Sequence, residues 1–128
     1  YLMTRKQFGK PLASFQIVQQ RLVAMLADLT GMQLYCMQSA RLAEVGKLSP
    51  TVAGLAKMHN TRTARKILSE ARDLLGGNGI LLENKVGRFF NDAEALYSYE
   101  GTKEINTLVV GRAVTGIGAF VGRRPATH

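Results

Sequence analysis

Residues 49–79 read SPTVAGLAKMHNTRTARKILSEARDLLGGNG and contain both a start and a stop signal for one long helix. Ser49 is a favourable N-cap, and Pro50 fits the first helical position, where a backbone N–H has no intrahelical partner. The glycines of the Gly76-Gly77-Asn78-Gly79 run tolerate the positive φ values that end a helix. Between these signals, apolar residues recur at helical spacing and predict an amphipathic helix. They are Ala53, Ala56, Ala64, Ile67, Leu68, Ala71, Leu74 and Leu75.

A longer helix is predicted before this one, from about Ser14 to Gly46. Ser14 is the candidate N-cap and Gly46 the candidate stop. At roughly 1.5 Å per residue this helix is close to 50 Å long, which is long for a lone globular helix and indicates a bundle. The apolar residues that recur along it are Phe15, Val18, Leu22, Met25, Leu26, Leu29 and Met32, continued by Cys36 and Ala40.

Shorter helical segments are expected after Gly79. One or two helical turns are predicted around residues 85–91, with Phe89 and Phe90 as core anchors, and a polar connection is expected to follow them. The last helix is predicted over about residues 102–120. Its inward-facing residues are expected to be Ile105, Leu108, Val109, Ala113, Gly116 and Ile117.

The predicted elements are all helices, and no alternating strand pattern persists long enough to indicate a sheet. The sequence therefore predicts an all-α fold, an up-and-down four-helix bundle. With 128 residues, of which 46% are hydrophobic, the chain fits one domain over residues 1–121, followed by a flexible tail over residues 122–128.

Composition excludes several classes of protein. Cys36 is the single cysteine and only two histidines are present, so a disulfide framework and a zinc finger are set aside, and we expect no metal site. No apolar run approaches the roughly 20 residues that cross a bilayer. A cytoplasmic location is therefore the default expectation.

The charge of the chain is positive and uneven. The net charge is +8, and residues 1–64 carry eight Lys and Arg against only Asp28 and Glu44. A basic half can attract nucleic acid, anionic lipid or the diphosphate of a nucleotide cofactor, or it can be a solvated face, and charge alone does not choose among these. A basic helical track is likewise expected to be solvated: Arg62, Arg65, Ser69 and Arg72.

Three short patterns exceed what a generic bundle needs. Residues 5–11 form a basic, glycine-containing loop before a helix, where cations and free N–H groups suit an anion. The glycines of residues 76–79 would let a backbone approach a flat or phosphorylated ligand, although glycines also stop helices. Glu100 precedes Gly101 at a helix start. Such a carboxylate can move a proton beside N–H groups that polarise a carbonyl, or it can merely complement the helix dipole.

In this order and spacing, the three patterns resemble the C-terminal domain of the acyl-CoA dehydrogenases over residues 1 to about 121. The matching segments are Arg5-Lys6-Gln7-Phe8-Gly9 with Gln16, then Leu75-Gly76-Gly77-Asn78-Gly79-Ile80, then Tyr99-Glu100-Gly101-Thr102. The residues from Glu100 to Ile117 are most similar to the glutaryl-CoA dehydrogenase branch and the related short-chain acyl-CoA oxidases. The resemblance implies a flavoenzyme that uses FAD. Its complete subunit would also have an N-terminal helical domain and a middle β-domain, both absent here, with Tyr1 near the end of the bundle's first helix.

The resemblance also implies a role for each matching residue. Glu100 matches the catalytic base, which removes the α-proton of an acyl-CoA thioester while the β-hydrogen leaves as hydride to flavin N5. Tyr99 and Gly101 match positions that contact the substrate. The cofactor-binding positions form a set that reaches the FAD of a neighbouring subunit and a set beside the flavin of the same subunit. The first set is Arg5, Phe8, Gln16, Asp73, Leu74, Leu75, Gly76 and Gly77, and the second is Thr102 and Glu104.

Two positions depart from the family's pattern. Asp73 stands where straight-chain members commonly have glutamine, although an acid is familiar in the glutaryl-type branch. Glu104 replaces the usual aspartate or glutamine, which makes its contact with the cofactor less secure than that of Thr102.

Several further expectations concern the complete protein. It is expected to oxidise an acyl-CoA in fatty acid or amino acid catabolism, with glutaryl-CoA as one candidate, and to form a homo-oligomer, a tetramer, through the bundle. Electron-transferring flavoprotein is the expected acceptor, and an acyl-CoA oxidase that uses oxygen is the alternative. A non-catalytic nucleic-acid-binding relative is another alternative, against which no aromatic stacking positions join the basic residues. The 128-residue chain alone is expected to be helical, oligomeric and inactive.

Overall fold

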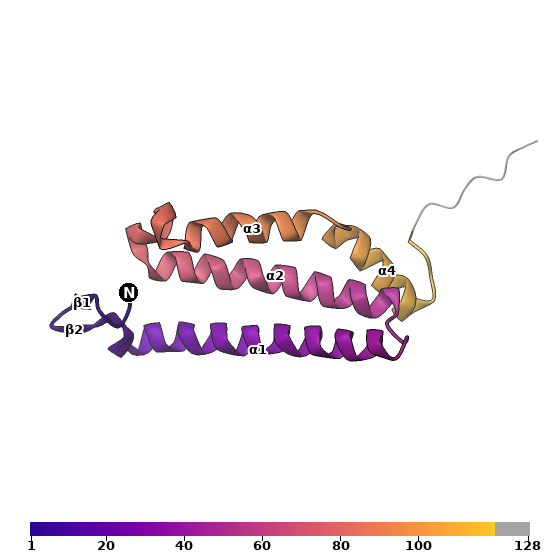
Figure 1. The fold of residues 1–128 in the computed structure, drawn as a ribbon, viewed down its shortest axis with the longest axis horizontal. Coiled ribbons are helices and arrows are strands. Elements are labelled where there is room, and N and C mark those ends of the chain that lie inside the picture. The colour runs from indigo at the N-terminus through magenta and orange to yellow at the C-terminus, as the bar shows by residue number, and fades with distance from the viewer. Residues whose placement is uncertain (120–128) are drawn as a thin grey trace, which may run out of the picture.

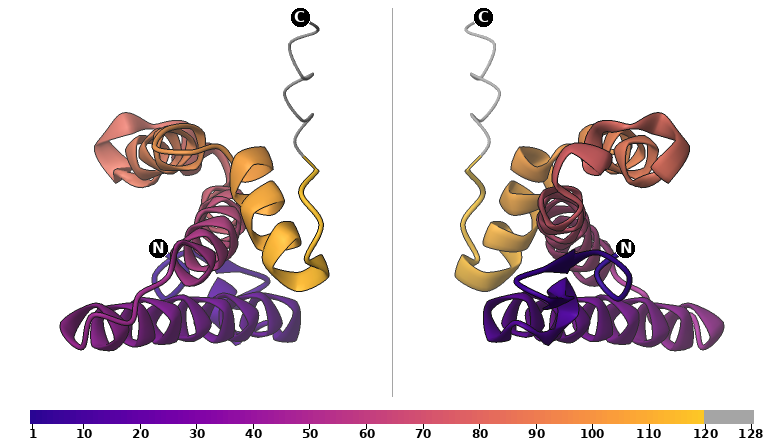
Figure 2. Two further views of the ribbon diagram at one scale, coloured as in Figure 1. Left: turned by 90° about the vertical axis from the view of Figure 1, so that its right-hand side faces the viewer. Right: turned by 90° about the vertical axis from the view of Figure 1, so that its left-hand side faces the viewer.

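The computed structural model describes residues 1–119, and within them the prediction of an all-α bundle is confirmed. Figure 1 shows α1 (Gln16–Glu44) and α2 (Pro50–Leu74) lying antiparallel, with α3 (Val86–Ser98) and α4 (Lys103–Thr115) following each other along the other side of α2. The end-on views of Figure 2 show α3 and α4 on two different sides of α2. Because α2 packs against the other three long helices, it is the central element of the fold.

The start of α1 differs from the prediction. A 3-10 turn, η1 (Leu12–Ser14), precedes α1, and the N-cap is Phe15, with no side-chain capping hydrogen bond. The Ser14 hydroxyl instead donates to the carbonyl of Pro11 at 2.7 Å, so the prediction that it caps α1 is wrong. The predicted stop is confirmed, because Gly46 follows the helix at a φ of 66°.

The signals that flank α2 act as predicted. The Ser49 hydroxyl accepts a hydrogen bond from the Val52 N–H at 3.2 Å, and Pro50 is the first helical residue. At the other end, Gly76 adopts a φ of +57°, which L side chains rarely reach. The chain then makes two 3-10 turns, η2 (Gly76–Ile80) and η3 (Leu82–Asn84), before α3 begins.

The helix α3 is longer than predicted, because polar residues expected in a connection pack against α2. Glu94 accepts a hydrogen bond from Arg65 at 2.6 Å, and the guanidinium of Arg65 lies 4.2 Å from the ring centroid of Tyr97. Arg65 is therefore not part of a purely solvated track. Phe89, predicted as a core anchor, is 50% exposed.

The last helix is shorter than predicted. It ends at Thr115, because Gly116 adopts a left-handed φ of 73°, while Phe120 lies outside the described residues. Ile105 and Ile117, expected to face inward, are 47% and 74% exposed. The proposed tail, residues 122–128, also lies outside the part of the chain that the structure describes.

Two short strands precede the helices, β1 (Lys6–Gln7) and β2 (Lys10–Pro11), although the sequence indicated no sheet. They form an antiparallel hairpin with Lys6 opposite Pro11. Phe8 and Gly9 both have positive φ at its tip, which is the geometry that two-residue hairpins favour. The hairpin leads into η1 and α1 at one end of the bundle (Figure 1).

Few side chains in residues 1–119 are fully enclosed. Ala93 and Thr63 are buried, whereas many large apolar side chains on all four helices are exposed. None of the helices described is long and apolar enough to cross a membrane. Within the same residues, no cluster of His, Cys, Asp or Glu could hold a metal ion.

Candidate functional site

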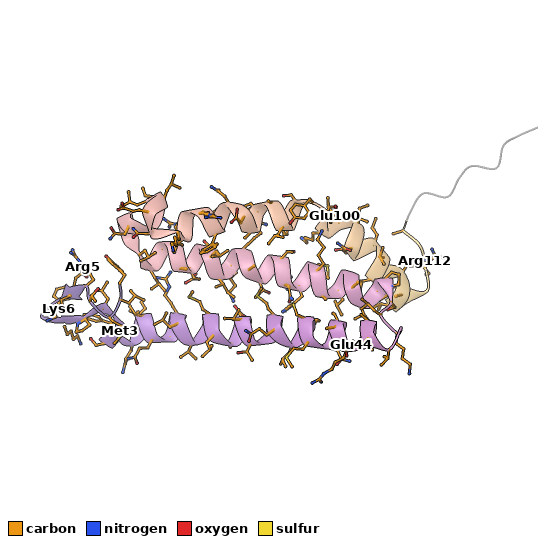
Figure 3. All side chains as sticks on the ribbon, viewed as in Figure 1. Met3, Arg5, Lys6, Glu44, Glu100 and Arg112 are labelled. Atoms are coloured by element: carbon orange, nitrogen blue, oxygen red, sulfur yellow. The ribbon has the colours of Figure 1, made fainter. Side chains whose placement is uncertain are left out.

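The turn that joins α3 to α4 has an unusual backbone. Tyr99 is extended, Glu100 adopts a φ of 56° and Gly101 a φ of 89°, and Thr102 then caps α4 through its hydroxyl. Positive φ is uncommon for a residue with a side chain such as Glu100. Together, the positive φ values of Glu100 and Gly101 reverse the direction of the chain sharply. Glu100 is exposed at this turn, where α3 passes into α4 (Figure 3).

Two side chains from outside the turn hold its carbonyl groups. The Lys57 ammonium on α2 donates to the carbonyl oxygens of Tyr99, Glu100 and Gly101, the last two at 2.7 Å each. The Asn106 amide on α4 donates to the carbonyls of Gly101 and Thr102 at 2.9 and 3.1 Å.

Gly54 lets α4 approach α2 at this point. A Cβ on Gly54 would lie 3.1 Å from the Asn106 Oδ1, closer than nine in ten real Cβ contacts. The small residue therefore allows Asn106 to sit beside the turn that it binds.

The N–H groups of Glu100 and Gly101 have no hydrogen-bond partner within residues 1–119. Unpaired N–H groups beside a carboxylate are suited to polarising a carbonyl while the carboxylate takes a proton from the adjacent carbon. The substrate-contacting positions predicted at Tyr99 and Gly101 flank Glu100 in this turn, and both are exposed.

A second group of predicted residues lies at the N-terminal end of the bundle. Figure 3 shows Arg5 and Lys6 there, on the hairpin and remote from Glu100. Arg5, Lys6 and Lys10 are exposed and form no ion pair with a carboxylate among the described residues. Phe8 is 91% exposed at the hairpin tip. Gln16, exposed at the start of α1, lies just beyond the hairpin.

The predicted stretch Asp73–Gly77 ends α2 on the same side of the molecule. Arg21 of α1 donates to Glu70 at 2.6 Å and to Asp73 at 2.7 Å, which ties this end of α2 to α1. Both the hydrogen bond and the positive charge of Arg21 lower the pKa of Asp73 below its ordinary value. The hydrogen bonds from its side chain to these carboxylates also raise the pKa of Arg21, chiefly through Asp73.

The residues that precede the hairpin and the end of α2 meet at an apolar hollow of about 360 Å³. Its lining joins residues on both sides, among them Leu2, Ala13 and Leu22 with the predicted positions Leu74 and Leu75. Gly76 and Gly77 lie beside it with open space where a Cβ would be, so their backbone is accessible.

The predicted residues thus form two groups rather than one site. Thr102 and Glu104, at the start of α4, join the Glu100 turn, whereas the hairpin and Asp73–Gly77 form the other group. The 13 residues of α3 separate the groups, which at 1.5 Å per residue amounts to about 20 Å.

Sequence reasoning missed Lys57, Asn106 and Arg21. Lys57 contacts carbonyls 42 to 44 residues away in the sequence, and Arg21 contacts acids 49 and 52 residues away. Only Asn106 has a local signal, because a polar side chain four residues after Thr102 can reach back to the helix start.

The sequence matches the family described as acyl-CoA dehydrogenase, C-terminal domain, over residues 1–115. A probable short/branched chain specific acyl-CoA dehydrogenase of Dictyostelium discoideum is 36% identical over 114 residues, which are 89% of this chain and 28% of that protein. The chain belongs to the acyl-CoA dehydrogenase family.

Solved structures agree with this assignment. Glutaryl-CoA dehydrogenase from Mycobacterium smegmatis has a TM-score of 0.91 at 39% identity, covering 94% of this chain and 31% of that chain. A second structure of a glutaryl-CoA dehydrogenase from the same organism, in complex with FADH2, has a TM-score of 0.91 at 37% identity with the same coverage.

A chain in the structure of the electron transferring flavoprotein of Acidaminococcus fermentans has a TM-score of 0.86 at 26% identity, over 90% of this chain and 30% of that chain. The present chain therefore spans less than a third of the length of the relatives described here.

Proposed function

We propose that this chain is the part of an FAD-dependent acyl-CoA dehydrogenase that supplies the catalytic base, Glu100. The observation that carries the proposal is the turn at residues 99–102, which exposes a carboxylate beside two N–H groups that have no partner within residues 1–119. Membership of the acyl-CoA dehydrogenase family supports the same chemistry.

In the proposed reaction, the Glu100 carboxylate takes the α-proton of the acyl-CoA thioester. The Glu100 N–H donates to the thioester carbonyl, which stabilises the negative charge that develops on oxygen as that proton leaves. Tyr99 packs near the thioester, and Gly101 leaves room for the acyl chain. Bound FAD would supply the acceptor, flavin N5, for the β-hydrogen that leaves as hydride, so that the substrate would become an α,β-unsaturated thioester.

The described residues fit FAD. The hairpin cations, which pair with no carboxylate in the described part of the chain, suit a diphosphate, since Arg5 can form paired hydrogen bonds with phosphate oxygens. Exposed Phe8 offers an aromatic face, and the open backbone at Gly76 and Gly77 allows a flat group to approach. We assign this group of residues, with Gln16 and Asp73–Leu75, to the FAD of a neighbouring subunit. Thr102 and Glu104 are assigned to the flavin beside their own Glu100.

Assigning the hairpin group to the FAD of a neighbouring subunit implies an assembly of more than one subunit. We therefore propose a homo-oligomer, a tetramer, assembled through the bundle. Glutaryl-CoA is proposed as a substrate and electron-transferring flavoprotein as the acceptor. Likeness to the Mycobacterium smegmatis and Acidaminococcus fermentans proteins supports these two assignments.

The test is Glu100→Gln in the complete subunit, mixed anaerobically with short acyl-CoAs that include glutaryl-CoA. The variant should keep its flavin but lose acyl-CoA-dependent bleaching of the flavin band, because the amide cannot accept the α-proton. Glu83→Gln is the matched control, since Glu83 is an exposed acid in η3, away from the turn. Reduction of the Glu100→Gln flavin at the wild-type rate would refute the assignment of the base.

The same preparation distinguishes the alternatives. Acyl-CoA-dependent peroxide formation in air would indicate an oxidase rather than a dehydrogenase. A wild-type subunit without a flavin band, but with steeply salt-dependent affinity for duplex DNA, would indicate a nucleic-acid-binding relative.

A further inference from the structure

Lys57 uses its whole hydrogen-bonding capacity on the turn that contains Glu100. A lysine ammonium has three N–H donors and no acceptor. Here the three donors face three consecutive carbonyl oxygens, those of Tyr99, Glu100 and Gly101. The side chain is half-buried, comes from the central helix α2 and has no carboxylate partner among the described residues. No donor is left over for a substrate or cofactor.

The position of these carbonyls fixes the direction of the neighbouring N–H groups. The peptide bonds of the described chain are all trans, and in a trans peptide the C=O and N–H point in opposite directions. When Lys57 draws the Tyr99 and Glu100 carbonyls toward α2, the N–H groups of Glu100 and Gly101 turn away from it. Neither of these two N–H groups has a hydrogen-bond partner among the described residues.

The same contact offsets an electrostatic and conformational cost. Three carbonyl dipoles that converge on one point repel one another, and a left-handed φ at Glu100 is unfavourable for a residue with a Cβ. A positive charge at the point of convergence removes the repulsion and stabilises the turn. Without it, the turn has other conformations open to it, in which the Glu100 N–H and side chain point elsewhere.

We propose that Lys57 is a positioning residue for the reaction: by gathering the carbonyls of residues 99–101, it aims the Glu100 N–H at the thioester oxygen and the carboxylate at the α-carbon. This inference rests on the proposed function, because it assigns no chemistry of its own to Lys57.

The test compares Lys57→Met, Lys57→Arg and the control Lys66→Met in the complete subunit. Methionine keeps the length of the side chain without charge or donors. Lys66 lies on the same helix and pairs with Asp28 of α1 at 2.8 Å, so its replacement removes a charge and an interhelical contact without touching the turn. Flavin content, the anaerobic rate of flavin reduction and the infrared band of a bound thioester are measured for each variant.

Lys57→Met should retain flavin and reduce it about 10- to 100-fold more slowly, as expected when reacting groups are misplaced. The probe for the N–H is butenoyl-CoA labelled with ¹³C at the thioester carbonyl. Hydrogen bonding lowers its carbonyl frequency in the wild type, and Lys57→Met should lose most of that shift. Lys57→Arg keeps the charge in a different geometry and should recover part of the reduction rate and part of the carbonyl shift. Lys66→Met should change neither the rate nor the shift.

The outcomes separate the inference from the function on which it rests. If the wild type reduces flavin with acyl-CoA, and Lys57→Met matches Lys66→Met in rate and carbonyl frequency, the positioning role is refuted and the proposed function stands. If the wild type itself shows no reduction, both are refuted. Should Lys57→Met fail to fold, Lys57→Arg provides the test. If Lys57→Arg has the flavin-reduction rate and the thioester carbonyl frequency of the wild type, a role for the three-donor geometry is refuted.

Discussion

Individual cations of this chain follow two different patterns. Lys57 and Arg21 are half-buried and satisfied within the fold, the first by carbonyl groups and the second by two carboxylates. Arg5, Lys6 and Lys10 are exposed and have no carboxylate partner within residues 1–119. Charges of the first kind fix the positions of neighbouring groups, and charges of the second kind remain available to an external anion.

The pair formed by Arg21 and Asp73 gives a prediction with a definite sign. Arg21 holds the pKa of Asp73 below its ordinary value, so the pair stabilises the fold above the unfolded pKa of the carboxyl. That stability is lost as the pH falls through the lowered, folded pKa. Arg21→Gln should therefore raise the pKa of Asp73 toward its ordinary value and move acid unfolding to higher pH.

The measurement is a carboxyl-carbon NMR titration of Asp73, together with acid unfolding followed by circular dichroism. Arg65→Gln is the control, because Arg65 forms an interhelical pair with Glu94 on α3 at 2.6 Å, close to the 2.7 Å of the pair between Arg21 and Asp73. That change should leave the Asp73 titration where it is in the wild type. An Asp73 pKa that does not respond to Arg21→Gln would show that the pair is not formed in solution.

At the scale of elements, the glycines that follow α2 have separate functions. A Cβ on Gly79 would lie 2.9 Å from the carbonyl carbon of Arg72 and closer still to its oxygen, and this helix backbone cannot yield cheaply. A Cβ on Gly77 would meet nothing within 4 Å. Gly79 thus lets η2 pack against the end of α2. Gly77 has no such packing function and leaves its backbone accessible to a ligand.

Gly79→Ala should consequently destabilise the chain by about 1–3 kcal/mol, the usual cost of forcing extra volume into a packed site. Gly77→Ala should change stability by less, and thermal or denaturant unfolding of the two variants checks the difference. In the complete subunit, Gly77→Ala should weaken FAD binding more than Gly79→Ala does, because Gly77 belongs to the proposed cofactor contact. Equal destabilisation by the two substitutions would contradict this division.

The helices predicted best are those whose ends depend on local chemistry. Ser49, Pro50 and Gly76 act through groups within a few residues of themselves, so the limits of α2 could be read from the sequence. The length of α3 could not, because Glu94 and Tyr97 are stabilised by contacts with Arg65 about 30 residues away. Tertiary contacts of this kind override local polarity.

The candidate site shows the same limit. Family resemblance and local pattern indicated the turn at Glu100, but not the lysine that holds it. Lys57 lies one turn after Gly54 on a helix with many polar residues, and nothing near it in the sequence identifies its partners. Its role depends on how α2 packs against the α3–α4 turn, which only the folded chain determines.

Within residues 1–119, the chain buries few side chains by itself. Ala93 is the one buried hydrophobic residue there, whereas many large apolar side chains are exposed. Much of the exposed surface is apolar, including Val23, Leu26, Leu34 and Met37 along α1. Such a surface is typical of a protein interface, which agrees with a domain that is covered by other domains or subunits.

The 128-residue chain alone should therefore self-associate, and the apolar surface of α1 should drive the association. Replacing Leu26 and Leu34, which are 63% and 59% exposed, by glutamate places two charges on that surface without removing a buried side chain. Sedimentation velocity should show oligomers for the wild type and a shift toward monomer for the double variant. Ser69→Glu, at an exposed polar position on α2, controls for added charge away from this surface and should leave the oligomers intact.

Circular dichroism at the same concentrations decides how that result is interpreted. Helicity retained in the monomeric double variant would show that α1 contributes to association rather than to the folding of the bundle. A wild-type chain that sediments as a monomer at all accessible concentrations would contradict the interface, and with it the proposal that the bundle assembles the oligomer. Loss of helicity together with dissociation would mean that covering the apolar face of α1 is a condition for folding, as expected for a domain that buries so little by itself.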